Sequence, residues 1–77
     1  MEDAFLQLLK GLRLEKNITQ KELADHLGFP QSYVSKYETG ERRLDFVETV
    51  YVCEALGISI QQFSKLLVEQ TKKSKRA

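Results

Sequence analysis

A chain of 77 residues with 42% hydrophobic residues and a formal net charge of +1 is long enough for one small globular domain. Its single cysteine excludes an internal disulfide, and beside a single histidine it offers no set of metal ligands, so we expect no metal and no cofactor. The chain has no secretion signal at its N-terminus and no run of about 18 apolar residues, and we therefore expect a cytoplasmic protein without a membrane span.

The distribution of charge limits what the net value means. Four of the twelve basic residues stand near the C-terminus, at Lys72, Lys73, Lys75 and Arg76, which leaves residues 1–70 with eight basic and eleven acidic side chains, a balance of −3. We expect residues 1–70 to form the folded domain and residues 71–77 to be a basic, flexible tail. A nucleic-acid partner would have to be recognised through the local placement of side chains, because the overall charge does not attract one.

The first predicted helix covers residues 2–16. Its apolar residues recur at helical spacing and form a core stripe: Phe5, Leu8, Leu9 and Leu12. Asn17 stands just after this helix, where Gly is the commonest residue and Asn the second, and Ile18 returns the chain to the core.

Two short helices joined by a tight bend are predicted next, over residues 19–27 and 31–38. Thr19 and Glu22 form a capping box at the start of the first helix, and its inward residues are Leu23, Ala24 and Leu27. Gly28 suits the left-handed residue that ends a helix, and Pro30 suits the first position of the next one.

The second of these helices has two different faces. Because successive residues advance by about 100°, Val34 and Tyr37 turn toward the preceding helix. The opposite face is polar and carries no acid: Gln31, Ser32, Ser35 and Lys36. Gln pairs bidentately with adenine, Lys with guanine, and Ser with either base, so this face has the chemistry to read the edges of DNA bases.

These residues resemble the helix-turn-helix of the phage repressor and Cro family, also called the Xre-type family. The matched residues are Gln20, Glu22-Leu23-Ala24, Leu27-Gly28 and Gln31-Ser32-x-Val34-Ser35-x-x-Glu38-x-Gly40, within a match that extends from about Leu9 to Leu67. The resemblance implies an all-α, five-helix, lambda-repressor-like DNA-binding domain with the helix-turn-helix at its second and third helices. One departure is Pro30, which stands where the family usually has Ser or Thr.

The resemblance also assigns roles outside the polar face. It implies that Arg13 forms a buried structural ion pair with Glu38, and that Gln20 bonds a DNA phosphate at the start of its helix. In the loop after Gly40, Arg42 and Arg43 stand where they could contact phosphates, and the alternative is an ordinary solvated turn. Tyr33 projects to the side of the recognition helix and is a further candidate for contact with the DNA backbone.

Two more helices are predicted, over residues 45–56 and 59–70. Capping boxes begin both of them, and Gly57 ends the first: Asp45 with Glu48, and Ser59 with Gln62. The expected inward residues are Phe46, Val50, Cys53, Leu56, Ile58, Ile60 and Phe63, so Cys53 is interpreted as a small buried hydrophobe and not as a nucleophile.

Several apolar residues exceed what one inward stripe needs. They are Val47, Tyr51, Leu66, Leu67 and Val68. Exposed apolar residues on a small domain often mark association, and we expect a two-fold homodimer with two recognition helices about 34 Å apart. The alternative is a monomer with a wider core stripe.

The leading hypothesis is a dimeric, sequence-specific DNA-binding transcriptional regulator that reads a pseudo-palindromic operator on double-stranded DNA through the major groove. The family includes small phage repressors, controller proteins and antitoxin-like regulators, and the sequence does not choose among them. Nor does it show whether RNA polymerase is contacted. The alternative is a protein-interaction module that keeps the fold and binds DNA weakly or not at all, favoured by the acidic balance of residues 1–70. An enzyme is not expected, because His26 has no partner for catalysis at usable spacing.

Overall fold

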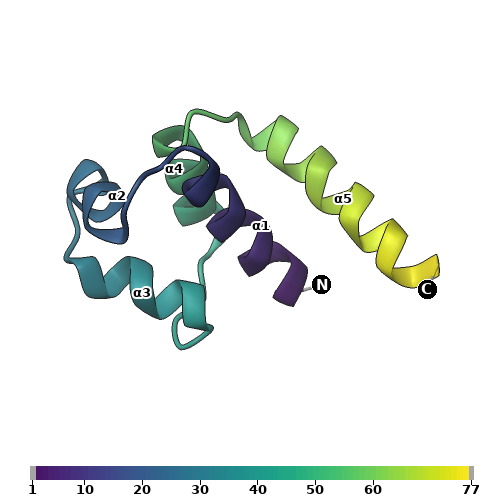
Figure 1. Cartoon of the computed structure of the whole chain (residues 1–77), viewed down its shortest axis with the longest axis horizontal. Helices are drawn as coiled ribbons and strands as arrows, with labels where there is room; N and C mark the ends of the chain where they lie inside the picture. The colour runs from purple at the N-terminus through teal and green to yellow at the C-terminus, as the bar shows by residue number, and fades with distance from the viewer. Residues whose placement is uncertain (1, 77) are drawn as a thin grey trace.

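The computed structural model describes residues 2–76, which form a small assembly of helices (Figure 1). The helices are α1 (Glu2–Glu15), α2 (Gln20–Leu27), α3 (Gln31–Thr39), α4 (Phe46–Ala55) and α5 (Ile60–Arg76). Within residues 2–76 there is no strand, so the predicted all-α architecture of five helices is confirmed.

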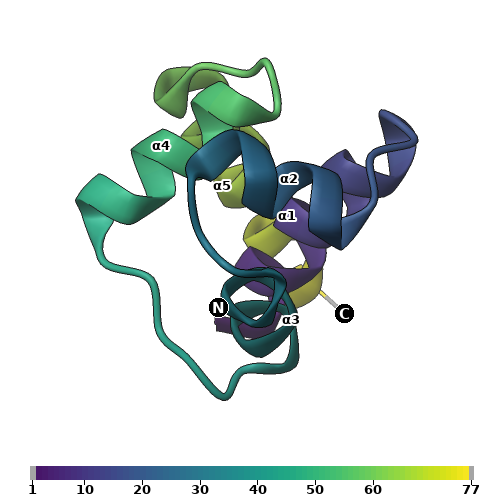
Figure 2. The same cartoon turned by 90° about the vertical axis from the view of Figure 1, so that its left-hand side faces the viewer.

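Helix α1 lies at the centre, with α3 packed on one side and α5 on the other (Figure 1). Helix α2 packs against α3 and α4, and α4 also packs against α5 (Figure 2). All five helices contribute to one core, whose side chains with at most 1% exposure are Leu9, Leu23, Ala24, Val34, Tyr37, Val52, Cys53, Leu56 and Phe63. Helix α3, which is the recognition helix of the helix-turn-helix, therefore packs on the same core as the rest of the domain.

The starts of the helices are fixed by side chains that bond to the backbone. At the start of α2 the Thr19 hydroxyl accepts from the Glu22 amide at 3.0 Å, and the Glu22 carboxylate accepts from the Thr19 amide at 2.9 Å. Reciprocal bonds of this kind also start α4 and α5, between Asp45 and Glu48 and between Ser59 and Gln62. All three predicted capping boxes are confirmed, which explains why these boundaries could be read from the sequence.

The bend of the helix-turn-helix depends on a residue in the left-handed region. Gly28 has φ of 80°, and Asn17 after α1 has φ of 57°, both as the sequence predicts. Pro30 differs from the prediction, because it lies before the first helical residue of α3 as its N-cap, with extended backbone and no side-chain hydrogen bond. Its carbonyl already accepts from the amide of Tyr33 at 2.9 Å, so the helix begins at Gln31 as expected.

Two other expectations were wrong. Phe46 was placed in the core but is 70% exposed. It lies on the same side of α4 as Cys53 but two turns earlier, at the first residue of the helix. Helix α5 was expected to end at Gln70 but continues to Arg76, because the residues after Gln70 include no Gly or Pro and are rich in Lys, which favours helix. The division into residues 1–70 and a flexible tail stays a prediction, and Ala77 lies outside the described residues.

Tyr37 leads to a prediction about stability. Its hydroxyl is buried and has no hydrogen-bond partner among the residues that the structure describes, and burial raises the pKa of this group far above its ordinary value. Tyr37→Phe removes an unsatisfied polar group and keeps the ring, so the free energy of unfolding should stay unchanged or rise by up to about 1 kcal/mol. Urea denaturation measures this effect.

Tyr33→Phe is the matched control for that experiment. The Tyr33 hydroxyl donates to the Glu48 carboxylate at 3.0 Å, so its removal should lower the free energy of unfolding by roughly 0.5–1.5 kcal/mol. A larger loss for Tyr37→Phe than for Tyr33→Phe would contradict the prediction.

Candidate nucleic-acid interface

The polar face of α3 points away from the core. Gln31, Ser32 and Lys36 are exposed and Ser35 is half-buried, whereas Val34 on the opposite face is fully buried. Helix α3 lies at the lower side of the molecule in Figures 1 and 2. The four polar side chains share the face of this helix that is opposite Val34. We call these four residues, Gln31, Ser32, Ser35 and Lys36, the α3 ridge. It contains donors and acceptors and no acidic group.

Three aromatic side chains pack against one another along the start of α3. The rings of Phe29 and Tyr33 lie 4.5 Å apart between centroids, and those of Tyr33 and Tyr37 lie 6.0 Å apart, edge to face. Such pairs favour defined orientations of the rings relative to one another. The direction of the α3 ridge follows from burial, because Val34 and Tyr37 on the opposite face are fully buried.

A buried ion pair fixes the other end of α3. Arg13 donates from Nε to Glu38 Oε2 at 2.7 Å and from a terminal nitrogen to Oε1 at 3.0 Å, and the two side chains are only 7% and 3% exposed. A third bond runs from Arg13 to the carbonyl of Ile18 at 2.8 Å. The hydrogen bond to Glu38 raises the pKa of Arg13 above its ordinary value. This is the pair that the resemblance implies, and it joins α1 to the recognition helix.

Gln20 also bonds the Glu38 carboxylate of this ion pair. Its side-chain amide donates to Glu38 Oε1 at 3.0 Å, so the group that the resemblance assigns to a DNA phosphate bonds a carboxylate within the protein. Gln20 and Glu38 are 18 residues apart, and neither residue type indicates the other in the sequence. Sequence reasoning therefore missed the supporting role of Gln20.

A second cluster joins the loop after α3 to α4. The Glu48 carboxylate accepts from the Tyr33 hydroxyl at 3.0 Å and from Arg42 at 2.5 Å, and the Arg42 guanidinium lies 4.7 Å from the centre of the Tyr33 ring. Hydrogen bonds lower the pKa of Glu48, first the one from the Asp45 amide and then those from the side chains. Tyr33 is 9% exposed, and its burial is the main cause of a raised pKa. Three of the four predicted phosphate contacts, Gln20, Tyr33 and Arg42, thus bond a carboxylate of the protein, and Arg43 is exposed in the loop after α3.

Glu48 is the residue in this cluster that sequence reasoning named only as a helix cap. The sequence did contain a signal for the Arg42 contact. The capping box fixes the Glu48 carboxylate at the start of α4, and Arg42 stands only six residues before Glu48, within reach of that carboxylate.

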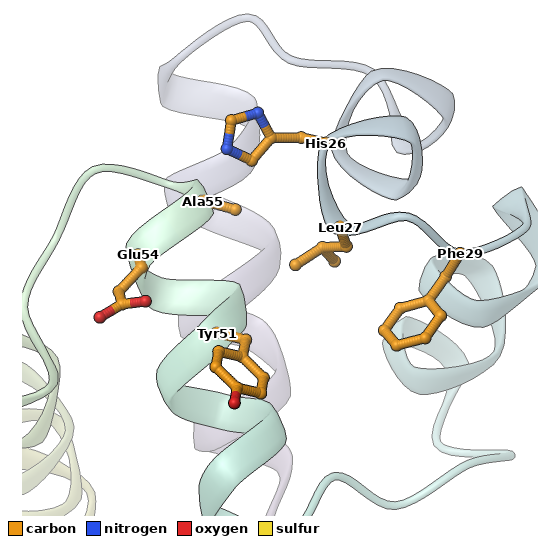
Figure 3. Close-up of a pocket in the computed structure, with 6 residues that line it drawn as sticks. All are labelled: His26, Leu27, Phe29, Tyr51, Glu54 and Ala55. Carbon is orange, nitrogen blue, oxygen red and sulfur yellow. The ribbon is translucent and has the colours of Figure 1, made fainter.

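A pocket of about 390 Å³ lies between the helix-turn-helix bend and α4. Figure 3 shows the residues that line it: His26, Leu27, Phe29, Tyr51, Glu54 and Ala55. The residue Tyr51 is 57% exposed, and Val47, one turn earlier, is 55% exposed. The outer side of α4 therefore presents apolar surface next to the bend.

The predicted dimer residues on α5 do not share one face. Leu66 borders a groove with Leu12 of α1 and with Lys16, which follows that helix, whereas Leu67 is half-buried against the core. Val68 is exposed and lies about 160° around the helix from Leu66, because each residue advances by about 100°. Leu66 and Val68 therefore point to different surroundings.

Three other features are absent from the described residues: a reactive cysteine, a metal site and a membrane-spanning helix. Burial raises the pKa of the Cys53 thiol to about 11, so the thiol is protonated at neutral pH. Over the same residues there is no cluster of His, Cys, Asp and Glu arranged to hold a metal ion. Nor is any described helix long and apolar enough to cross a membrane.

The chain matches known proteins in sequence. Residues 9–63, more than half of the chain, match the family model described as helix-turn-helix. Over 48 residues the chain is 40% identical to y4dJ, an uncharacterized HTH-type transcriptional regulator of Sinorhizobium fredii (strain NBRC 101917 / NGR234). This match covers 62% of the chain and 62% of the length of that relative.

The fold also matches solved structures. An XRE-family like protein from Pseudomonas syringae pv. tomato str. DC3000 has a TM-score of 0.85 and 44% identity, with 91% of this chain and 85% of that chain covered. The restriction-modification controller protein C.Esp1396I, as a tetramer in complex with its natural 35 base-pair operator, has a TM-score of 0.81 and 26% identity, with 88% and 90% covered. These matches agree with the helix-turn-helix geometry of α2 and α3, and the chain belongs to the Xre-type helix-turn-helix family.

Proposed function

We propose that this protein is a sequence-specific DNA-binding regulator that binds a pseudo-palindromic operator through the major groove as a homodimer in the cytoplasm. The observation that carries the proposal is the α3 ridge, which is polar and free of acids and lies opposite the buried residues Val34 and Tyr37, on a helix joined to α1 by a buried ion pair. The controller protein C.Esp1396I, which is bound to its operator in its structure, shares the fold and supports a DNA ligand. A family of transcriptional regulators also gives no reason to propose an enzymatic activity.

The contacts divide by chemistry. Gln31, Ser32, Ser35 and Lys36 are proposed to contact base edges, because they stand on the outer face of the helix that enters the groove. Arg43 is proposed to contact phosphate, since it is exposed in the loop that follows this helix. Gln20 and Tyr33 are better described as supports, because their polar groups already bond Glu38 and Glu48.

The homodimer is proposed to form through the exposed apolar side of α4, with Val47 and Tyr51 at its centre. A two-fold dimer would place two recognition helices about 34 Å apart on one side of the duplex. Tyr51→Glu should shift the protein from dimer to monomer in sedimentation at micromolar concentration, because it introduces a charge into the apolar contact. Leu14→Glu on α1 is the matched control, with 55% exposure against 57% for Tyr51, and should leave the dimer intact. A wild type that sediments as a monomer would refute the dimer.

Selection of bound sequences from random duplex DNA tests the proposed function. Enrichment of an inverted repeat by the wild type is the expected result. The alternative function, a protein-interaction module, is favoured by the balance of −3 over residues 1–70 and by the apolar surface on α4. Lack of binding to any duplex even at low salt would favour that module.

A further inference from the structure

Arg42 lies beside the part of α3 that is proposed to enter the groove. Its backbone belongs to the loop after α3, yet its guanidinium returns to the first turns of the helix and lies 4.7 Å from the centre of the Tyr33 ring. A cation at the side of a recognition helix is well placed to reach the phosphates that flank the groove. The position of Arg42 therefore suits contact with a phosphate, but its guanidinium is already bonded to the Glu48 carboxylate.

Glu48 holds this guanidinium and is itself held in place. Its Oε1 accepts from the Asp45 amide at 3.0 Å, and its own amide donates to the Asp45 carboxylate at 2.7 Å, so the side chain is part of the cap of α4. Its Oε2 accepts from both Arg42 and Tyr33. Glu48 cannot follow Arg42 toward DNA without breaking the cap and its bond to Tyr33.

We propose that Glu48 withholds Arg42 from the DNA backbone and so limits the strength of binding to every DNA sequence. The inference rests on the proposed function. A phosphate that binds Arg42 replaces one anion by another, so the exchange gains little attraction and releases few counterions from the duplex. Because phosphate contacts carry no sequence information, the limit acts equally on operator and random DNA. Specific recognition is then left to the α3 ridge.

Glu48→Gln tests the inference with little change to the fold. Glutamine serves as well as glutamate in a capping box, so the bond from the Asp45 amide is kept while the charge that pairs with Arg42 is lost. Binding to a random-sequence duplex at low salt should become about two- to fivefold tighter, which is the range for one exposed ion pair. The plot of log K against log salt concentration should become steeper by about one, as expected for one new phosphate contact.

Two control variants isolate the role of Arg42. Glu69→Gln makes the same change of charge at an exposed position on α5, across the molecule from α3 in Figure 1, and should leave the salt dependence unchanged. Adding Arg42→Ala to Glu48→Gln should return both affinity and salt dependence to the wild-type values. Arg42→Ala alone should weaken binding to all sequences about equally, since it leaves the Glu48 carboxylate without its counter-charge beside the duplex.

The outcomes separate the inference from the proposed function. If the wild type binds DNA and Glu48→Gln shows the same salt dependence as Glu69→Gln, the inference is wrong and the function stands. An increase confined to the operator would also overturn it, because a phosphate contact acts on all sequences. Failure of both wild type and Glu48→Gln to bind any duplex at low salt would overturn the proposed function, and the inference with it. Circular dichroism of each variant confirms that it is folded.

Discussion

Replacing Glu38 by alanine is expected to lower the free energy of unfolding by about 3–5 kcal/mol, the largest loss that we predict for one substitution. The substitution leaves the Arg13 guanidinium without a counter-charge at a site where the paired side chains are 7% and 3% exposed. Two hydrogen bonds from Arg13 and one from the Gln20 amide lose their acceptor at the same time. Because small domains have little stability in reserve, a large fraction of the variant should be unfolded at ambient temperature.

Urea denaturation followed by circular dichroism measures the loss, and two further variants identify its cause. The double variant Arg13→Met with Glu38→Leu removes both charges and should recover much of the stability, because an apolar replacement of a whole buried pair is often neutral. Lys21→Ala breaks an exposed pair with Asp25, whose side chains are 70% and 66% exposed, and should cost less than about 1 kcal/mol. A melting temperature of Glu38→Ala equal to that of the wild type would refute the prediction.

Base preference should survive in the folded fraction of the Glu38→Ala variant. Glu38 is buried between α1 and α3, so it is not placed to touch a base. Its role is to hold the end of α3, and its loss should weaken binding through the population of folded protein. Selection with the variant at low temperature should therefore recover the same sequence as the wild type, with lower yield.

The elements that could be predicted from the sequence are those with local signals. Thr19 and Glu22 are three residues apart, and the capping box that they form is confirmed by reciprocal hydrogen bonds. Gly28 likewise ends α2 at the predicted position, and Asn17 is left-handed as expected, although α1 ends at Glu15, one residue before its predicted end. Val34 is buried, as the helical spacing of apolar residues predicts. This spacing is also a local signal, because it depends only on residues of one helix.

Contacts between residues that are distant in the sequence could not be predicted from local patterns. Phe46 has the correct angle for the core, but its exposure depends on how far the neighbouring helices extend, which no local pattern records. Gln20 and Tyr33 were assigned to phosphate, yet their polar groups bond carboxylates 18 and 15 residues away. A polar side chain at a helix start or on a helix flank has the same sequence signature whether its partner is a ligand or a residue of the same chain. The Arg13 and Glu38 pair, 25 residues apart, was named only through the resemblance.

Gln31→Ala and Lys36→Ala should each weaken binding to the selected operator by about 1–3 kcal/mol and relax the preference at one base position. Both side chains are exposed on the α3 ridge, so their removal changes the surface that reads DNA and leaves the core intact. Titration of each variant against the operator and its single-base variants measures the change in preference. Arg43→Ala is the control, since loss of a phosphate contact should weaken binding to all sequences about equally. Equal losses on every sequence from all three variants would refute the division between base readers and backbone contacts.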